Sequence, residues 1–232
     1  MFRDIEADCY LMIDGDDTYP SKHAREMCNL ILEQKADMVI GDRLSSTYFT
    51  ENKRPFHNIG NKLVRLLVNK LFNNKVKDIM TGYRAFNRKF VKGFPIVSKG
   101  FEIETEMTIH SSNKNYKVVE VEVDYKDRPK GSESKLNTYK DGFKILMTIL
   151  KLTREYRPRL YFNVISFLSF IVWLIFSNLI FDVNNQNISN LAMLSMVVSF
   201  FVGIVLSHIN KKDRKQYELF MNILENNNEK ID

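Results

Sequence analysis

The sequence predicts a layered α/β domain followed by a membrane hairpin of two helices. Up to residue 125, short apolar runs alternate with segments of helical periodicity, which is the pattern of a sheet covered by helices. Two later segments, 160–181 and 188–209, contain no Asp, Glu, Lys or Arg. Each is long enough to cross a hydrocarbon layer of about 30 Å. With 232 residues and 44% apolar content, the chain can also form one substantial core.

Three segments of the first part have the pattern of strands. Cys9–Ile13 is a short apolar run that ends at Asp-Gly, and Met38–Ile40 is a second short run that Gly41 closes. Tyr116–Tyr125 alternates apolar and polar residues, as a half-buried strand does. Because Cys9–Ile13 is apolar throughout, such a strand would normally be covered on both faces and paired on both sides, which argues against an intact small variant of the domain.

Two segments have the periodicity of amphipathic helices. Pro20–Gln34 begins with Ser21 as a candidate cap, and its apolar face contains Ala24, Met27, Cys28, Ile31 and Leu32. The apolar positions of His57–Phe72 are Ile59, Leu63, Leu66, Leu67 and Leu71. A third segment, Tyr139–Leu152, mixes lysines with apolar residues, and we expect it to lie at the membrane interface.

The two uncharged segments predict membrane spans. Buried core helices are the alternative, but a soluble domain seldom contains two such runs separated by a short polar loop. The basic residues that flank them place both ends in the cytoplasm; these are Arg154, Arg157, Arg159, Lys211, Lys212, Arg214 and Lys215. The net charge of +6 also permits a nucleic-acid partner. We do not expect one, because membrane topology already explains many of the basic residues.

An acidic turn directly follows the first predicted strand, in the stretch LMIDGDDTYP. Asp14 and Asp16 would stand at the carboxyl edge of the sheet, where open α/β sheets bind their ligands, and Gly15 would let the backbone turn. Carboxylates of this kind suit Mg²⁺ or Mn²⁺ and the phosphate oxygens of a nucleotide. Taken alone, the same residues also fit a solvated turn.

Three further segments carry groups suited to a sugar or a phosphate. KDIMTGYRAF combines Asp78, a glycine and Arg84, and could line a sugar pocket. GFEIETEM places Glu102 and Glu104 two residues apart. DRPKGSESKL, residues 127–136, combines cationic and hydroxyl side chains with a glycine, which suits a phosphate-binding loop; a basic flexible linker is the alternative.

The four segments, in this order and ahead of a membrane hairpin, resemble the polyprenyl-phosphate glycosyltransferases of family 2, which include dolichyl-phosphate mannose synthases and undecaprenyl-phosphate glucosyltransferases. The resemblance covers residues 9–209. It implies a GT-A (Rossmann-like) fold. It also implies a metal-dependent, inverting transfer of a sugar from a nucleotide sugar to a dolichyl or undecaprenyl phosphate at the cytoplasmic side of a two-span membrane protein.

The resemblance also implies roles for individual residues. Asp14 and Asp16 would bind the metal, Mg²⁺ or Mn²⁺, and the donor diphosphate. The catalytic residues would be Asp16, Asp78 and Arg84, the last two near the transferred sugar. The acceptor would be bound by Arg128, Ser134, Lys135, Glu102 and Glu104. Thr18 stands where some members carry a metal-binding Gln.

Members of this family begin with a Val/Ile-rich strand and an Asp-Asp-Gly turn that hold the base and ribose of the donor, and neither precedes Asp14. We therefore expect a fragment or half of a split enzyme, with a partner chain that supplies the N-terminal half or with a second copy. The expected divisions are a partial catalytic domain (1–136), a juxtamembrane amphipathic segment (137–159), the hairpin (160–209) and a cytoplasmic tail (210–232). A catalytically inactive, membrane-anchored binding or scaffold protein is the alternative function.

The predicted topology can be tested by cysteine labelling of intact cells. A single cysteine at Asn185, in the loop between the spans, should react with a membrane-impermeant probe, and one at Lys230 should not. Equal labelling of the two positions would contradict a hairpin with both ends in the cytoplasm.

Overall fold

The computed structural model describes residues 4–46, 55–96, 98, 100–126, 138–177 and 183–228. The chain divides into two compact units, Met1–Ile149 and Leu150–Asp232. The first unit contains the sheet and the second contains the long apolar helices, so the mixed α/β prediction is confirmed. The more specific GT-A arrangement stays a prediction.

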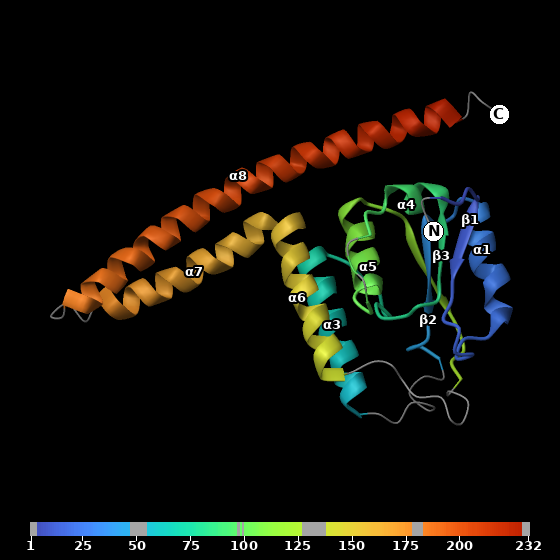
Figure 1. Ribbon diagram of the computed structural model, residues 1–232, viewed down its shortest axis with the longest axis horizontal. Helices are drawn as coiled ribbons and strands as arrows, with labels where there is room; N and C mark the ends of the chain where they lie inside the picture. Colours follow the sequence, from blue (N-terminus) through green and yellow to red (C-terminus); the bar gives the residue numbers. More distant parts are fainter. Residues whose placement is uncertain are drawn as a thin grey trace. The chain divides into compact units, whose positions relative to one another are not determined.

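The first unit is built on a four-stranded mixed sheet of order β1-β3-β2-β4 (Figure 1). β3 runs antiparallel to both of its neighbours, and β4 runs parallel to β2. The carboxyl ends of β1, β2 and β4 therefore lie at the same edge of the sheet as the amino end of β3. The strands are β1 (Cys9–Met12), β2 (Met38–Asp42), β3 (Arg84–Asn87) and β4 (Val118–Glu122).

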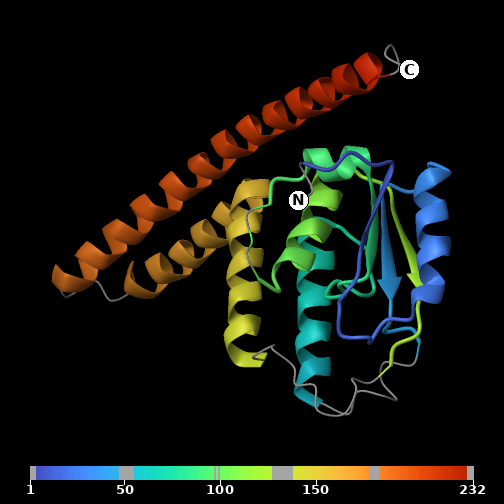
Figure 2. The same cartoon turned by 45° about the vertical axis from the view of Figure 1, so that its right-hand side comes forward.

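Helices cover both faces of this sheet. α1 lies on one side, while α3 and α5 lie on the other and pack against each other (Figures 1 and 2). The short helix α4 follows β3 directly and is capped by the Asn87 side chain, which accepts a hydrogen bond from Phe90 N. The bounds are η1 (Ser21–His23), α1 (Ala24–Leu32), α3 (Pro55–Phe72), α4 (Arg88–Gly93) and α5 (Ile103–Asn113).

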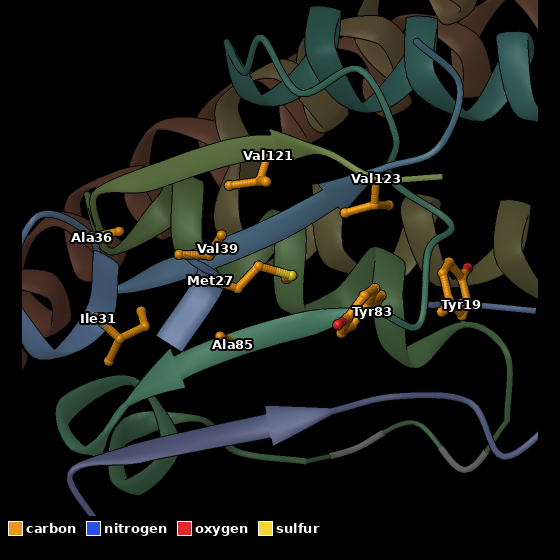
Figure 3. Close-up of a cluster of buried hydrophobic side chains, with 9 residues drawn as sticks. All are labelled: Tyr19, Met27, Ile31, Ala36, Val39, Tyr83, Ala85, Val121 and Val123. Carbon is orange, nitrogen blue, oxygen red and sulfur yellow. The ribbon is translucent and has the colours of Figure 1, made fainter. Parts of the chain in front are cut away.

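The strands alternate their side chains between the two faces. Val39, Ala85 and Val121 point to the face that α1 covers, where they meet Met27 and Ile31 (Figure 3). Tyr19 and Tyr83 extend the same cluster to the edge at which β2 ends, with ring centroids 5.3 Å apart. The buried core on this side therefore reaches the turns that follow the strands.

The local predictions hold for most elements. The segments read from periodicity overlap with β1, α1, β2, α3 and β4, whereas the sequence analysis assigned no strand or helix to β3, α4 or α5. Cys9–Met12 is a strand, but among the described residues it pairs only with β3, and Leu11 remains 38% exposed. Within the described residues this apolar strand therefore lies at the edge of the sheet, with part of its surface exposed.

Helix α3 also buries a different face from the predicted one. Val64, Val68 and Phe72 are buried, while Leu63 and Leu66 are 46% and 59% exposed. Because α3 is apolar on several sides, periodicity alone did not distinguish the face that contacts the sheet layer.

The second unit consists of two long apolar helices, α7 (Pro158–Ser177) and α8 (Val183–Asn228), which pack against each other. Both are long and apolar enough to span a membrane, and their most apolar windows are 0% and 11% buried. The alternative of two buried core helices does not fit this exposure. α8 also continues to Asn228, so the predicted tail after residue 209 is helical as far as it is described.

Small and hydroxyl residues line the contact between α7 and α8. Ser169 and Ser195 hydrogen-bond to each other at 3.0 Å, and Ser166 donates to Met196 O at 3.0 Å. A Cβ at Gly203 would stand 2.9 Å from Phe162 Cβ, so the two backbones approach closely here. This is how helices associate in lipid, where burying apolar side chains provides no driving force.

Replacement of Gly203 by Ala should weaken this helix pair. The added Cβ would stand closer to Phe162 than real carbon contacts do, so α7 and α8 must separate; such overpacking costs about 1–3 kcal/mol. Thermal unfolding in detergent should show a lower midpoint. Gly142→Ala in α6 (Thr138–Tyr156) is the control, because nothing lies within 4 Å of its Cβ and Ala favours a helix. A midpoint for Gly203→Ala at or above that of the unmodified chain would contradict the close approach.

Candidate active site

The candidate site lies at the sheet edge where β1 and β2 end and β3 begins. Asp14 and Asp16 follow β1, Arg43 follows β2, and the loop 77–83 leads into β3. Segments separated by up to about seventy residues in sequence therefore meet at one edge, as ligand sites of open α/β sheets do.

The acidic turn is held by its own side chains. Asp16 Oδ1 accepts hydrogen bonds from the Thr18 hydroxyl at 2.6 Å and from Thr18 N at 3.3 Å. Asp17, not Gly15, adopts the left-handed conformation, with φ of 59°. Asp14 remains exposed while Thr18 is buried. In this turn Asp14 is therefore exposed to solvent, while hydrogen bonds from Thr18 hold the Asp16 carboxylate in place.

Gly82 brings the loop 77–83 against the Asp14 carboxylate. A Cβ at position 82 would lie 2.5 Å from Asp14 Oδ1 and 2.7 Å from Oδ2, so only a glycine permits this approach. The first and second sequence motifs, predicted separately to contact the donor, therefore meet at this carboxylate.

Asp78 forms a buried ion pair with Arg43. Asp78 is 1% exposed, and its Oδ2 lies 2.9 Å from Arg43 Nε. Arg43 also donates to Met80 O at 2.8 Å and to the Tyr19 hydroxyl at 3.3 Å. Burial raises the pKa of Asp78, and Arg43 opposes that shift. Asp78 Oδ1 has no hydrogen-bond partner among the described residues.

Arg84 supports the loop from inside the protein. It is fully buried, and its guanidinium donates to Ile79 O at 2.6 Å, Thr81 O at 3.0 Å and the Thr108 hydroxyl at 3.0 Å. Burial lowers its pKa to about 10, so it stays protonated at neutral pH. In this structure Arg84 is a positioning residue, and its predicted place near the transferred sugar stays a prediction.

Glu104 lies in the electrostatic neighbourhood of the same groups. Burial raises its pKa to about 7, Arg84 lowers it and the negative charge of Asp14 raises it further. Glu104 and Glu102 both stand at the start of α5, Glu102 at its cap position. Glu104 therefore interacts electrostatically with Arg84 and Asp14, and the predicted acceptor contacts of both glutamates stay predictions.

Arg128, Ser134 and Lys135 lie outside the described residues. The chain just before them is placed, because Lys126 N donates to Thr18 O at 3.0 Å. Lys126, the last described residue before them, therefore lies beside the acidic turn.

The candidate metal ligands in the acidic turn fit a hard divalent cation only in part. Within the described ranges, no group of three or more His, Cys, Asp or Glu side chains is placed to hold a metal ion. Asp14 and Asp16 provide carboxylate oxygens, and Mg²⁺ is commonly bound through one or two carboxylates with substrate phosphates completing its shell. The residues present thus fit a metal that is shared with a phosphorylated ligand.

Arg43 and Tyr19 were missed in the sequence analysis. Arg43 directly follows β2 just as Asp14 closely follows β1, so its position at a strand's carboxyl end was the available signal. Tyr19 is buried, hydrogen-bonds with Thr81 at 3.2 Å and lies beside Tyr125. Burial raises its pKa to about 12.

The raised pKa of Glu104 predicts a loss of stability at high pH. The pKa of Glu104 rises from 4.5 to about 7 on folding. The favourable contribution of its carboxyl group to the free energy of unfolding is therefore complete below pH 4.5 and is lost as the pH increases through about 7. In Glu104→Gln, the decrease in the free energy of unfolding with increasing pH should be smaller by up to about 3 kcal/mol. Chemical unfolding in detergent with EDTA, at pH 5 and pH 8, measures the difference. Parallel pH dependence of the variant and the unmodified chain would contradict this assignment.

Comparison with known proteins identifies several relatives, and no protein-family model matches the chain. Glycosyltransferase AglJ of Haloferax volcanii is 32% identical over 165 residues, which are 71% of this chain and 54% of AglJ. A dolichyl-phosphate hexose transferase of the same organism is 30% identical, over 63% of this chain and 62% of that protein. The chain thus spans little more than half the length of these two enzymes.

A third relative is covered almost completely. An uncharacterised protein of Shigella flexneri is 39% identical over 159 residues, which are 64% of this chain and 97% of the Shigella protein. The relatives named as glycosyltransferases support a glycosyltransferase family. The chain belongs to the same family as the Shigella protein.

Proposed function

We propose that the chain takes part in moving a sugar from a nucleotide-sugar donor to a polyprenyl phosphate, dolichyl or undecaprenyl, at a membrane. The observation that carries the proposal is the meeting of two motif segments at Asp14, which are the acidic turn itself and Gly82 of the following motif. The charge of Asp14 also helps to raise the pKa of Glu104 in a third segment. Glycosyltransferase relatives support sugar transfer as the class of reaction.

On the donor side, Asp14 and Asp16 are proposed to bind the diphosphate of the nucleotide sugar together with Mg²⁺ or Mn²⁺. The ion would neutralise the charge of the leaving nucleoside diphosphate. The chain's own contribution is to hold both carboxylates in place, Asp16 through Thr18 and Asp14 against Gly82. The ion pair between Asp78 and Arg43 then helps to hold the adjacent loop 77–83 in place.

On the acceptor side, the proposed nucleophile is a phosphate monoester oxygen of the lipid. Its second pKa is about 6, so the oxygen is largely ionised at neutral pH and needs no general base. It attacks the anomeric carbon as the bond to the donor diphosphate breaks, which inverts that carbon. Arg128, Ser134 and Lys135 are proposed to bind the lipid phosphate, and the loop that carries them starts beside Thr18.

The lipid acceptor is supported by two further observations. α7 and α8 are long and apolar enough to cross a membrane and are largely exposed. One relative is named dolichyl-phosphate hexose transferase, and the chain spans 62% of that protein. A water-soluble acceptor would not require such an anchor.

The proposal predicts that Asp16→Asn reduces sugar transfer by about a hundredfold or more, the usual effect of removing one group that stabilises charge in a transition state. Transfer of radiolabelled sugar to polyprenyl phosphate, in membranes with Mn²⁺ and a panel of nucleotide sugars, is the measurement. Asp17→Asn is the matched control, because Asp17 is exposed in the same turn and Asn tolerates its left-handed conformation.

Transfer by Asp16→Asn at the parental rate would refute the metal and donor site. Retained binding of polyprenyl phosphate without transfer from any donor, even after the N-terminal half of a glycosyltransferase relative is added, would instead favour the inactive binding or scaffold protein.

A further inference from the structure

Glu120 is an acidic residue in the middle of strand β4 that has no role in the site described above. Its neighbour Val121 belongs to the core cluster on the α1 side of the sheet (Figure 3), and Val119 packs against the same cluster. Because side chains alternate along a strand, Glu120 points to the other face, opposite the buried Ile40 of β2. The residue is partly buried. A carboxylate at such a position needs polar partners, because burial removes part of its hydration.

Two consecutive backbone amides of a distant segment are partners of this carboxylate. Glu120 Oε1 accepts hydrogen bonds from Lys77 N at 2.7 Å and from Asp78 N at 3.3 Å. Burial raises the pKa of Glu120, and these two hydrogen bonds oppose that shift. The ionised form of Glu120 is therefore stabilised by the first two residues of the loop 77–83.

The end of β2 holds the same two residues by their side chains. Lys77 Nζ lies 3.7 Å from Oδ2 of the buried Asp42. Asp78 Oδ2 lies 2.9 Å from Arg43 Nε. Because β2 and β4 are paired in parallel, adjacent strands provide all of these contacts. The start of the loop is thus fixed relative to the strand ends of the candidate site.

Glu120 and the two arginines bind complementary groups of the loop. Arg43 and Arg84 donate to three carbonyl oxygens farther along it, whereas Glu120 accepts from two N–H groups at its start. Because Asp78 is buried, removal of its amide's acceptor would leave that N–H unsatisfied or draw it out to water. Movement toward water would pull the Asp78 carboxylate away from Arg43.

We propose that Glu120 is a positioning residue of the candidate site: its carboxylate fixes the start of the loop 77–83 and so helps to set the places of Asp78 and of Gly82 against Asp14. The role in catalysis rests on the proposed sugar transfer, whereas the role in placing the loop does not. The alternative role of such an acid is to prevent unwanted strand pairing, because β4 is an edge strand among the described residues.

The test compares Glu120→Ala with Glu120→Gln in the full chain in detergent. Alanine removes the acceptor oxygen, while glutamine keeps an uncharged one and should restore part of the function. Glu122→Ala is the matched control, because Glu122 is an exposed glutamate on the same face of the same strand. Hydrogen exchange, resolved to single residues by mass spectrometry, is measured at the Lys77 amide and, as the internal reference, in strand β2.

In Glu120→Ala, the Lys77 amide should exchange at least about tenfold faster than in the unmodified chain, as expected when a charge-assisted hydrogen bond is lost. The increase should be smaller in Glu120→Gln and absent in Glu122→Ala, with β2 protected in all three variants. Unchanged exchange at Lys77 in Glu120→Ala would overturn the proposal and favour the edge-strand role. An equal loss of protection in β2 would also overturn it, because Glu120 would then support the sheet and not the loop.

Sugar transfer by the same variants tests the role in catalysis. Transfer should decrease by about tenfold to a hundredfold in Glu120→Ala, as small displacements of a site do, less in Glu120→Gln and not in Glu122→Ala. Parental transfer by Glu120→Ala together with faster exchange at Lys77 would overturn this role. Absence of transfer by the unmodified chain would count against the proposed function alone, because hydrogen exchange still decides whether Glu120 places the loop.

Discussion

The position of loop 77–83 depends on two arginines, the buried Arg84 and the partly buried Arg43, and the candidate site depends on that loop. Arg84 satisfies two of its carbonyl oxygens, while Arg43 pairs with Asp78 and binds a third carbonyl. Removing one partner of a buried ion pair typically costs about 3–5 kcal/mol, because it leaves a charge uncompensated. The loop therefore has one strongly preferred place, which brings Gly82 against Asp14.

That placement creates a region of concentrated negative charge at the sheet edge. Asp14 is exposed, and its charge helps to raise the pKa of the neighbouring Glu104. Arg84 and Arg43 balance this charge from the buried side, where their donors are already used by the protein. An exposed carboxylate beside a second acidic group is the electrostatic condition that attracts a cation and its phosphate ligand.

The two units are stabilised by different forces. In the first unit, apolar side chains leave water as α1, α3 and α5 cover the sheet. In the second, α7 and α8 keep their apolar side chains exposed and meet through Gly203 and serine hydroxyls. α6 combines both features, because its Ile145 is buried in the protein while its Phe143 is exposed. The exposed apolar surface is thus continuous in sequence from the amphipathic helix to the long apolar helices.

The sequence by itself determined the features that depend on local pattern: helix α1, strand β2, the core of β4, the two long apolar helices and the motif residues Asp14, Asp78 and Glu104. Periodicity and composition act over a few residues, so one chain was enough to identify them. Only the tertiary structure decided that β1 lies at the sheet edge and that α3 buries Val64 and not Leu63, because several sides of these elements are apolar. It also decided the roles of the arginines. Arg43 meets Asp78 across 35 residues and Arg84 turns inward to carbonyl oxygens, and such pairings depend on how distant segments pack.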